Sequence, residues 1–175
     1  FITGGFHIDG FGDTCDGFFA AKGRDKVLDI MKDSRIGTFA AIGIIINLLI
    51  KFEGYKYIAV NEELTAALIF IPMISRAAIV FLCLIGKPAK EGGLGNLFIN
   101  NVGISQLIVN IAGAMTIGFI SGLSLVNIGV NLITTTVIVF LFNKLCVDKI
   151  GGITGDSLGA INELVTLALL LIISI

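Results

Sequence analysis

Five long apolar runs limit what this chain can fold into, because soluble domains rarely contain so many. They lie at about 36–50, 64–86, 102–120, 124–142 and 157–175. Most approach the roughly 20 residues that an α-helix needs to cross a bilayer. The composition agrees, since 55% of the residues are hydrophobic, 14% are charged and the mean hydropathy is +0.99. We predict an all-α, polytopic membrane bundle with about five transmembrane helices.

The first run is the shortest, and its end is open. Either the helix continues past Lys51, whose ammonium then reaches toward the lipid headgroups, or the segment tilts or re-enters the membrane. No tandem repeat or soluble second domain is visible. We therefore expect one domain over 1–175, with a cytoplasmic acidic, interfacial helical region at 1–35 and a transmembrane bundle at 36–175. The chain starts with Phe, so we expect an N-terminally truncated fragment.

Net charge and rare residue types argue against several functions. A net charge of −1, without a basic stripe interleaved with aromatic residues, predicts no nucleic-acid binding. Cys15, Cys83 and Cys146 are odd in number and far apart, so neither a disulfide framework nor a CxxC metal site is expected. His7 is the only histidine, which excludes His-rich zinc chemistry.

Basic residues predict the orientation of the bundle. They collect in short cytoplasmic loops, and placing 1–35 inside leaves only Lys51 and Lys56 in the outside loops. The inside segments then hold nine cations: Lys22, Arg24, Lys26, Lys32, Arg35, Lys87, Lys90, Lys144 and Lys149. This orientation puts 1–35, 87–96 and 148–159 on one face, where they can form one site. We predict a multi-pass protein of the cell (inner) membrane whose active site faces the cytoplasm.

Three aspartates near the N-terminus form the first candidate site. In a helix over about 9–22, Asp9, Asp13 and Asp16 stand at i, i+4 and i+7 and share an arc of about 60°. Carboxylates this close repel one another unless a cation lies among them. Hard oxygen ligands suit magnesium or manganese, which neutralise phosphate oxygens. The alternative is a solvated helix N-terminus, where acids meet the helix dipole favourably.

Glycines interleaved with these acids favour the ion site. Gly10, Gly12 and Gly17 are poor helix formers that a solvated face does not explain, whereas they leave room for a ligand beside the backbone. His7 lies two residues before Asp9 and can be a ligand, a general base or a hydrogen-bonded structural residue. We favour a supporting role for it behind the ion ligands.

A charged segment precedes the first span. Within 22–37, Lys32 and Arg35 lie just before the apolar run, where cations can hold phosphate groups. Asp33 between them can add a metal ligand. The alternative is a wet interfacial helix whose charges at 25–29 form i,i+4 ion pairs.

Ionisable residues also stand inside predicted spans. Arg76 is flanked by apolar residues on both sides, a costly placement that calls for a partner or a water-filled cavity. It serves either in function or in a structural ion pair with Glu163. Asp156 and Glu163 share one face of the last span, which should face the bundle interior. The glycine-rich turn at 151–155 can offer backbone N–H groups to phosphate, and Asp156 can cap its own helix.

Several blocks of the chain resemble one family. GGFHIDGFGDTCDG at 4–17 and DKVLDIMKDSRIGTFA at 25–40 resemble the cobalamin synthase family, the adenosylcobinamide-GDP ribazoletransferases. Arg76, KPAKEGGLG at 87–95 and GGITGDSLGAINE at 151–163 follow in the family's order. The resemblance implies a membrane enzyme that joins α-ribazole or α-ribazole 5′-phosphate to adenosylcobinamide-GDP and releases GMP. Its cofactor would be magnesium.

The resemblance also implies roles for the candidate residues. These are Asp9, Asp13 and Asp16 as metal ligands; His7, Asp16 and Asp33 as catalytic groups; and Lys32, Arg35, Arg76, Asp156 and Glu163 as substrate contacts. The expected partners are adenosylcobinamide-GDP, α-ribazole or its 5′-phosphate, and the lipid bilayer. Association into a homo-oligomer stays open.

Two other functions compete with this one. A CDP-alcohol phosphotransferase of phospholipid synthesis also places acids on membrane helices, but its motif has Ala-Arg after the first Asp-Gly, where this chain has Phe11 and Gly12. A cation-coupled transporter would use Arg76, Asp156 and Glu163 as an intramembrane relay. Most of the charge gathers in loops on one predicted side, so catalysis is preferred over transport.

Overall fold

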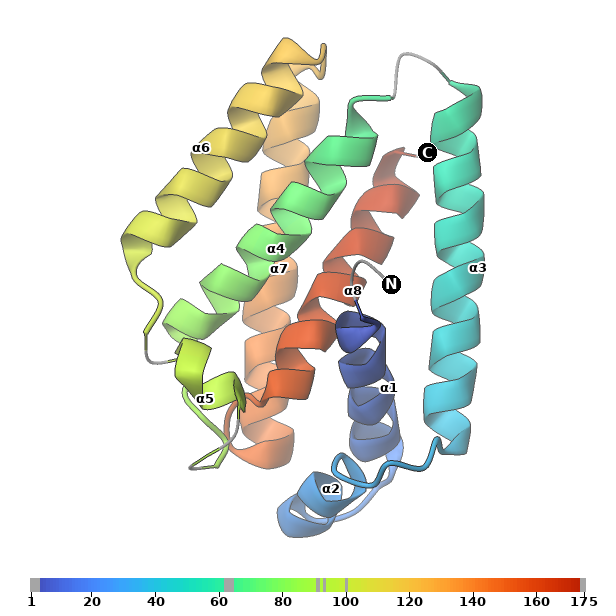
Figure 1. Ribbon diagram of the computed structural model, residues 1–175, viewed down its shortest axis with the longest axis vertical. Helices are drawn as coiled ribbons and strands as arrows, with labels where there is room; N and C mark the ends of the chain where they lie inside the picture. Colours follow the sequence, from blue (N-terminus) through green and yellow to red (C-terminus); the bar gives the residue numbers. More distant parts are fainter. Residues whose placement is uncertain (1–3, 62–64, 91, 93, 100, 174–175) are drawn as a thin grey trace.

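The computed structural model describes residues 4–61, 65–90, 92, 94–99 and 101–173, and this part of the chain is helical without a β-strand (Figure 1). Its helices are α1 (Phe6–Phe19), α2 (Arg24–Ile30), α3 (Thr38–Val60), α4 (Ala67–Ile85), α5 (Leu94–Ile99), α6 (Ile104–Ile120), α7 (Leu125–Ile150) and α8 (Gly155–Ile173). The predicted all-α membrane bundle is confirmed.

Four of these helices are long and apolar enough to cross a membrane. They are α3, α4, α7 and α8, with 23, 19, 26 and 19 residues, or about 28 to 39 Å at 1.5 Å per residue, against a hydrocarbon core of about 30 Å. The remaining predicted run forms α6, which is shorter at 17 residues. The first run, predicted at 36–50, continues to Val60, so it does extend past Lys51.

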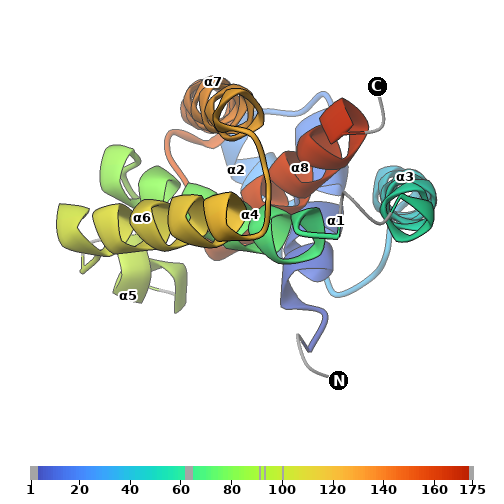
Figure 2. The same cartoon turned by 90° about the horizontal axis from the view of Figure 1, so that it is seen from above.

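Helix α8 lies at the centre of the bundle. Seen from above, α8 lies between α7 and α3, with α1 and α4 against it (Figure 2), and it packs on all four. The predicted interior stripe is buried, since Glu163 is 4% exposed and Ala160, on the same face, is 1% exposed. The predicted burial of the face that carries Glu163 is therefore confirmed. Ile161, Val165 and Leu169, on the other side of α8, are also fully buried. The outer faces of α3 and α6 instead expose large apolar side chains such as Leu49, as expected of surfaces that meet lipid.

Helix α1 packs directly on α8, and its glycines make this possible. A Cβ atom at Gly10 would lie 2.8 Å from the Cα atom of Asp156, and one at Gly159 would lie 2.9 Å from the carbonyl oxygen of His7. Residue numbers rise along α8 as they fall along α1 between these two contacts, so the two helices are antiparallel. The other motif glycines are also filled by protein: Gly12 faces Ile44 and Gly17 faces Met31. The prediction that the glycines leave room for a ligand is wrong, because neighbouring helices and side chains occupy that space.

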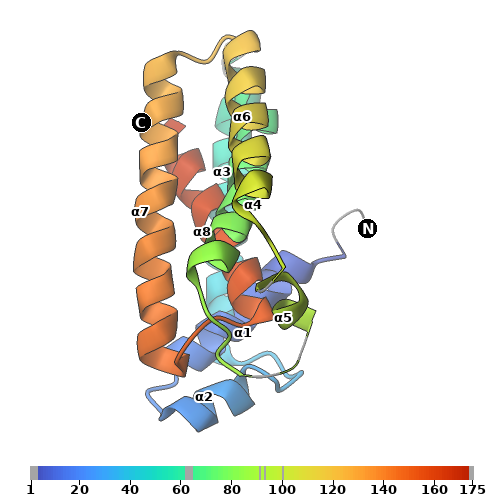
Figure 3. The ribbon, with the colours of Figure 1, turned by 90° about the vertical axis from the view of Figure 1, so that its left-hand side faces the viewer.

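Two loops meet at the end of the bundle where α8 begins, close to the short helices α2 and α5 (Figure 3). Pro88 and Ile153 form an isolated parallel bridge. The N–H of Ala89 donates to the carbonyl of Ile153 at 2.9 Å, and the N–H of Ile153 donates to that of Lys87 at 2.9 Å. Arg24 Nη2 donates to the carbonyl of Ala89 at 2.7 Å. The three polar segments predicted to converge therefore do so.

Candidate active site

The acidic face of α1 is the first part of the site. The helix predicted over 9–22 is observed at Phe6–Phe19, and it carries Asp9, Asp13 and Asp16. Burial of the Asp13 carboxyl is the main reason that its pKa rises to about 6. The negative charges of Asp156, Asp9 and Asp16 raise this pKa further. A cation bound beside the Asp13 carboxyl would relieve the repulsion among these negative charges.

Asp16 has a second task, which is to begin helix α3. Its Oδ2 atom accepts a hydrogen bond from the N–H of Gly37 at 2.7 Å, and its Oδ1 atom accepts one from the N–H of Ala40 at 2.8 Å. Both N–H groups lie at the start of a helix, where they lack partners within the helix. Asp16 therefore acts as a helix cap supplied from another helix. Its predicted metal and catalytic roles stay predictions.

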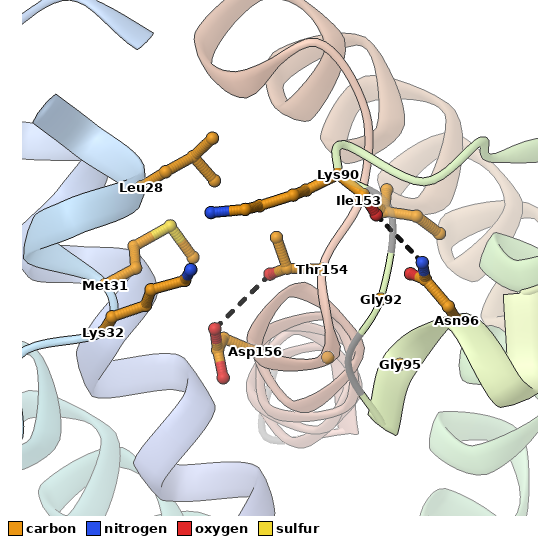
Figure 4. A pocket seen from close by; sticks show the side chains of 11 residues that line it. Leu28, Met31, Lys32, Lys90, Gly92, Gly95, Asn96, Ile153, Thr154 and Asp156 are labelled. Carbon is orange, nitrogen blue, oxygen red and sulfur yellow. Dashed lines mark hydrogen bonds between the residues drawn. The ribbon is translucent and has the colours of Figure 1, made fainter. Parts of the chain in front are cut away.

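A cavity of about 480 Å³ opens between α2, the loop before α5 and the start of α8 (Figure 4). Lys32 and Lys90 reach into it from opposite sides, above Asp156. Side-chain contact with Lys90 and its like charge lower the pKa of Lys32. In the described part of the chain neither lysine forms an ion pair. Two adjacent ammonium groups of this kind favour an anion. Glu91 and Gly93 of the same loop lie outside the described residues.

A smaller cavity of about 200 Å³ adjoins the first, and Lys32 lines both. The ion pair of Asp33 with Arg35, with 2.5 Å between Oδ2 and Nη2, lies at its rim. The hydrogen bonds from Arg35 lower the pKa of Asp33 to about 2. Five of the predicted site residues thus come together here: Asp9, Asp13, Lys32, Asp33 and Arg35. The alternative of i,i+4 ion pairs at 25–29 is not observed among the described residues.

Thr154 and Ser157, which were not among the predicted site residues, cap the start of α8. The N–H of Ser157 donates to Thr154 Oγ1 at 3.2 Å, and the N–H of Thr154 donates to Ser157 Oγ at 3.2 Å. This reciprocal pair is a capping arrangement. Thr154 and Ser157, and not Asp156 as suggested, therefore form the cap of α8. The Asp156 carboxylate accepts a long bond of 3.5 Å from the Thr154 hydroxyl and lines the larger cavity.

A third cavity, of about 300 Å³, lies deeper in the bundle and is lined by His7, Lys51, Arg76 and Glu163 among others. Lys51 forms an ion pair with Glu163, and Asn47 Nδ2 donates to the same carboxylate at 3.0 Å. The predicted contact of Lys51 with headgroups is wrong, because this buried acid attracts its ammonium. The predicted pairing of Arg76 with Glu163 is also wrong.

Arg76 makes a different contact, and His7 shares its cavity. Arg76 Nη1 donates to the carbonyl of Pro72 at 2.9 Å, one turn earlier in its own helix. Burial lowers the pKa of His7, and the positive charge of Arg76 lowers it further. His7 is therefore neutral near pH 7 and able to accept a proton. We expected His7 to support the aspartate ligands from behind, but its side chain lines this deeper cavity instead.

The donor set fits magnesium as an ion held partly by substrate. Among the described residues, no group of three or more His, Cys, Asp or Glu side chains is arranged to hold one metal ion. Magnesium, however, is commonly bound by one or two carboxylates together with water and substrate phosphates. Asp9 and Asp13 line one cavity and are hard oxygen donors. They suit such a partial site.

Comparison with known families decides the relationship. A family model described as cobalamin-5-phosphate synthase matches residues 1–174. The chain belongs to this family. The resemblance of the N-terminal blocks is thereby confirmed.

Three curated relatives of the chain share the name adenosylcobinamide-GDP ribazoletransferase. The relative from Clostridium botulinum strain 657 is 45% identical over 177 residues, which cover 98% of this chain and 68% of the relative. Those from Clostridium kluyveri and Clostridium tetani are 44% and 42% identical, and the matches cover 94% and 98% of this chain and 65% and 68% of each relative. The chain thus spans about two thirds of their length. No solved structure matches it.

In this member of the cobalamin-5-phosphate synthase family, all the predicted site residues except Asp16 fall into two groups. The first surrounds the two adjoining cavities, and Arg76, Glu163 and His7 surround the deeper one. Lys90 and Lys51 were not predicted as site residues. Lys90 could have been found, because its loop was expected to join the site. Lys51 could not, because its partner lies 112 residues away.

Proposed function

We propose that this chain is an adenosylcobinamide-GDP ribazoletransferase, which joins α-ribazole or its 5′-phosphate to adenosylcobinamide-GDP and releases GMP. The observation that carries the proposal is a match over 98% of the chain, at 45% identity, to a relative of that name. The polar cavities at one end of an otherwise apolar bundle support it. A diphosphate substrate needs cations and metal-binding acids in close proximity, and these cavities have both.

The diphosphate would lie in the larger cavity, between the lysines and the acids. Lys32 and Lys90 supply two positive charges there, and Arg35 adds a guanidinium at the adjoining cavity. Asp9 and Asp13, with Asp156 nearby, would hold magnesium. When bound, this ion neutralises phosphate oxygens and stabilises the charge that moves onto the departing GMP. We assign Asp16 to positioning, because both its oxygens already accept backbone hydrogen bonds.

The chemical step is a displacement at phosphorus. A ribose hydroxyl oxygen attacks the phosphorus on the cobinamide side, so a new O–P bond forms. The bond from that phosphorus to the bridging oxygen breaks, and this oxygen leaves with GMP. The proton of the hydroxyl passes to a base, and we assign this role to the neutral imidazole of His7. The lysines need only hold the diphosphate in line with the attacking oxygen.

The site would face the cytoplasm of a cell membrane. The end of the bundle that carries the site is where α2, the connections on either side of it, the loop before α5 and the end of α7 lie (Figure 1). These segments contain Lys22, Arg24, Lys26, Lys32, Arg35, Lys87, Lys90, Lys144 and Lys149. Basic residues of this kind stay on the cytoplasmic side during insertion. Both substrates are polar, so they would reach this end from water.

The test uses membranes that contain the protein expressed from its complete gene. They are incubated with adenosylcobinamide-GDP and α-ribazole 5′-phosphate, with magnesium or with a chelator, and GMP and the corrinoid product are separated by chromatography. We expect GMP only when both substrates and magnesium are present. Absence of GMP in all conditions refutes the proposed function.

Asp13→Asn tests the metal assignment in the same assay. The amide keeps the shape of the side chain but is a weak ligand, so product formation should fall by at least about 100-fold. The matched control is Asp25→Asn, which alters an exposed aspartate on α2 and should leave turnover unchanged. Immunoblots should show equal amounts of both variants in the membrane. Normal turnover by Asp13→Asn contradicts the metal assignment.

A further inference from the structure

The deeper cavity is a polar site between the helices of the bundle, with Glu163 buried in it and Arg76 exposed at its edge. Its residues come from four helices: His7 from α1, Lys51 from α3, Arg76 from α4, and Asn162 and Glu163 from α8. Three of these helices are candidate membrane spans. Ionisable groups are costly at that depth, and they therefore usually mark a functional site or pair with one another. The Lys51–Glu163 pair accounts for two of the charges and leaves Arg76 without an acidic partner among the described residues.

Arg76 keeps hydrogen-bonding capacity that the described part of the chain does not use. Its Nη1 atom donates to the carbonyl of Pro72 in its own helix, and no other hydrogen bond of the side chain is observed among the described residues. Asn162 also lines the cavity, but its Nδ2 atom donates to Glu163 Oε1 at 3.4 Å and its Oδ1 atom is buried in the packed interior. The guanidinium of Arg76 is therefore the group most available to a ligand.

The charge and the volume of the cavity limit the kinds of ligand that it can bind. Lys51 and Arg76 outnumber Glu163 among the charged lining residues, so the cavity favours an anionic ligand. Its volume of about 300 Å³ is at the lower end for small-molecule sites. This space suits one nucleoside but not adenosylcobinamide-GDP, which contains a corrin ring and two nucleosides.

The position of the cavity relates it to the proposed diphosphate site. Asp156 and Glu163 lie on one face of α8, seven residues apart, which corresponds to about 10 Å along the helix. A nucleoside 5′-phosphate can bridge such a distance. Its sugar would then lie at the end of the deeper cavity that is nearest to the phosphate to be attacked. His7, which lines the cavity, would stand beside that sugar.

We propose that the deeper cavity binds the accepting nucleoside, and that Arg76 recognises its 5′-phosphate. The inference rests on the proposed function, and the name of the family, cobalamin-5-phosphate synthase, is consistent with an acceptor that carries a phosphate. Arg76 is thus a specificity-determining residue that distinguishes α-ribazole 5′-phosphate from α-ribazole.

The experiment measures KM for each substrate in membranes with wild-type protein, Arg76→Gln, Arg76→Lys and the control Lys56→Gln. Lys56 is an exposed cation on α3 outside the cavity, paired with Glu53. For Arg76→Gln we expect KM for α-ribazole 5′-phosphate to rise about 10- to 100-fold, because charged hydrogen bonds of this kind contribute that much. The KM values for α-ribazole and adenosylcobinamide-GDP should change less than about threefold.

The other variants and substrates of this experiment distinguish a failure of this inference from a failure of the proposed function. Arg76→Lys should recover most of the affinity for the 5′-phosphate, and Lys56→Gln should behave as wild type. A rise in KM for adenosylcobinamide-GDP, or an equal rise for both acceptors, overturns the inference while the transferase function stands. Wild-type protein that prefers unphosphorylated α-ribazole also overturns it. Wild-type membranes that release no GMP overturn the proposed function itself.

Discussion

Replacing Gly10 with alanine should damage the site without adding or removing any charge. The new Cβ atom would lie 2.8 Å from both the Cα and the carbonyl oxygen of Asp156. Ordinary contact begins at 3.4 Å, so α1 and α8 must separate by at least 3.4 − 2.8 = 0.6 Å. Both atoms belong to the backbone of α8, so no side chain can rotate away. Overpacking of this kind destabilises by about 1–3 kcal/mol, partly offset by the better helix propensity of alanine, up to about 1 kcal/mol.

The larger effect should appear in turnover. The shift moves the acids of α1 relative to Asp156, and a misplacement near 1 Å can lower a rate about 100-fold. We therefore expect Gly10→Ala to enter the membrane, to melt a few degrees lower in detergent, and to release GMP about 10- to 100-fold more slowly. The matched control is Gly129→Ala in α7, where a Cβ would meet nothing within 4 Å. Wild-type turnover by Gly10→Ala, or equal loss in both variants, refutes the close-packing argument.

Two other substitutions test the assigned structural contacts. Asp16→Asn keeps one of the two acceptors that begin α3, so it should lower stability by about 1 kcal/mol and reduce turnover far less than Asp13→Asn; complete loss of turnover in stable protein would instead make Asp16 a ligand. Glu163→Ala leaves the partly buried Lys51 ammonium without its partner, at a cost below the roughly 3–5 kcal/mol of a fully buried pair, and should reduce the amount of folded protein recovered in detergent. The double variant Lys51→Met with Glu163→Met should restore folded protein, and its failure to do so contradicts the ion-pair explanation.

The acid cluster and the convergence of loops could be predicted from the sequence, because both depend on short-range regularities. A spacing of i, i+4 and i+7 puts three aspartates on one face of any helix, and α1 is helical over that stretch. Alternating membrane spans bring every second loop to the same side. The meeting of Ala89 with Ile153 follows from this rule.

The roles of individual charges could not be predicted in the same way. Asp16 resembles Asp13 in sequence, yet its carboxylate reaches Gly37 and Ala40, which are 21 and 24 residues away. The sequence also left the end of the first span open. In a hydropathy pattern, a charged residue such as Lys51 indicates the end of an apolar span. In the structure the Glu163 carboxylate pairs with this charge, and α3 continues to Val60.

The sequence by itself determined that this chain crosses a membrane and belongs to the cobalamin-5-phosphate synthase family, because hydrophobicity and motif order can be read segment by segment. Only the tertiary structure decided which charge neutralises which and which glycines admit a neighbouring helix. Those outcomes depend on contacts of a few ångströms between segments far apart in the chain, such as Gly10 with Asp156. The attraction between two charges falls with distance, so their partners are known only once the helices are packed.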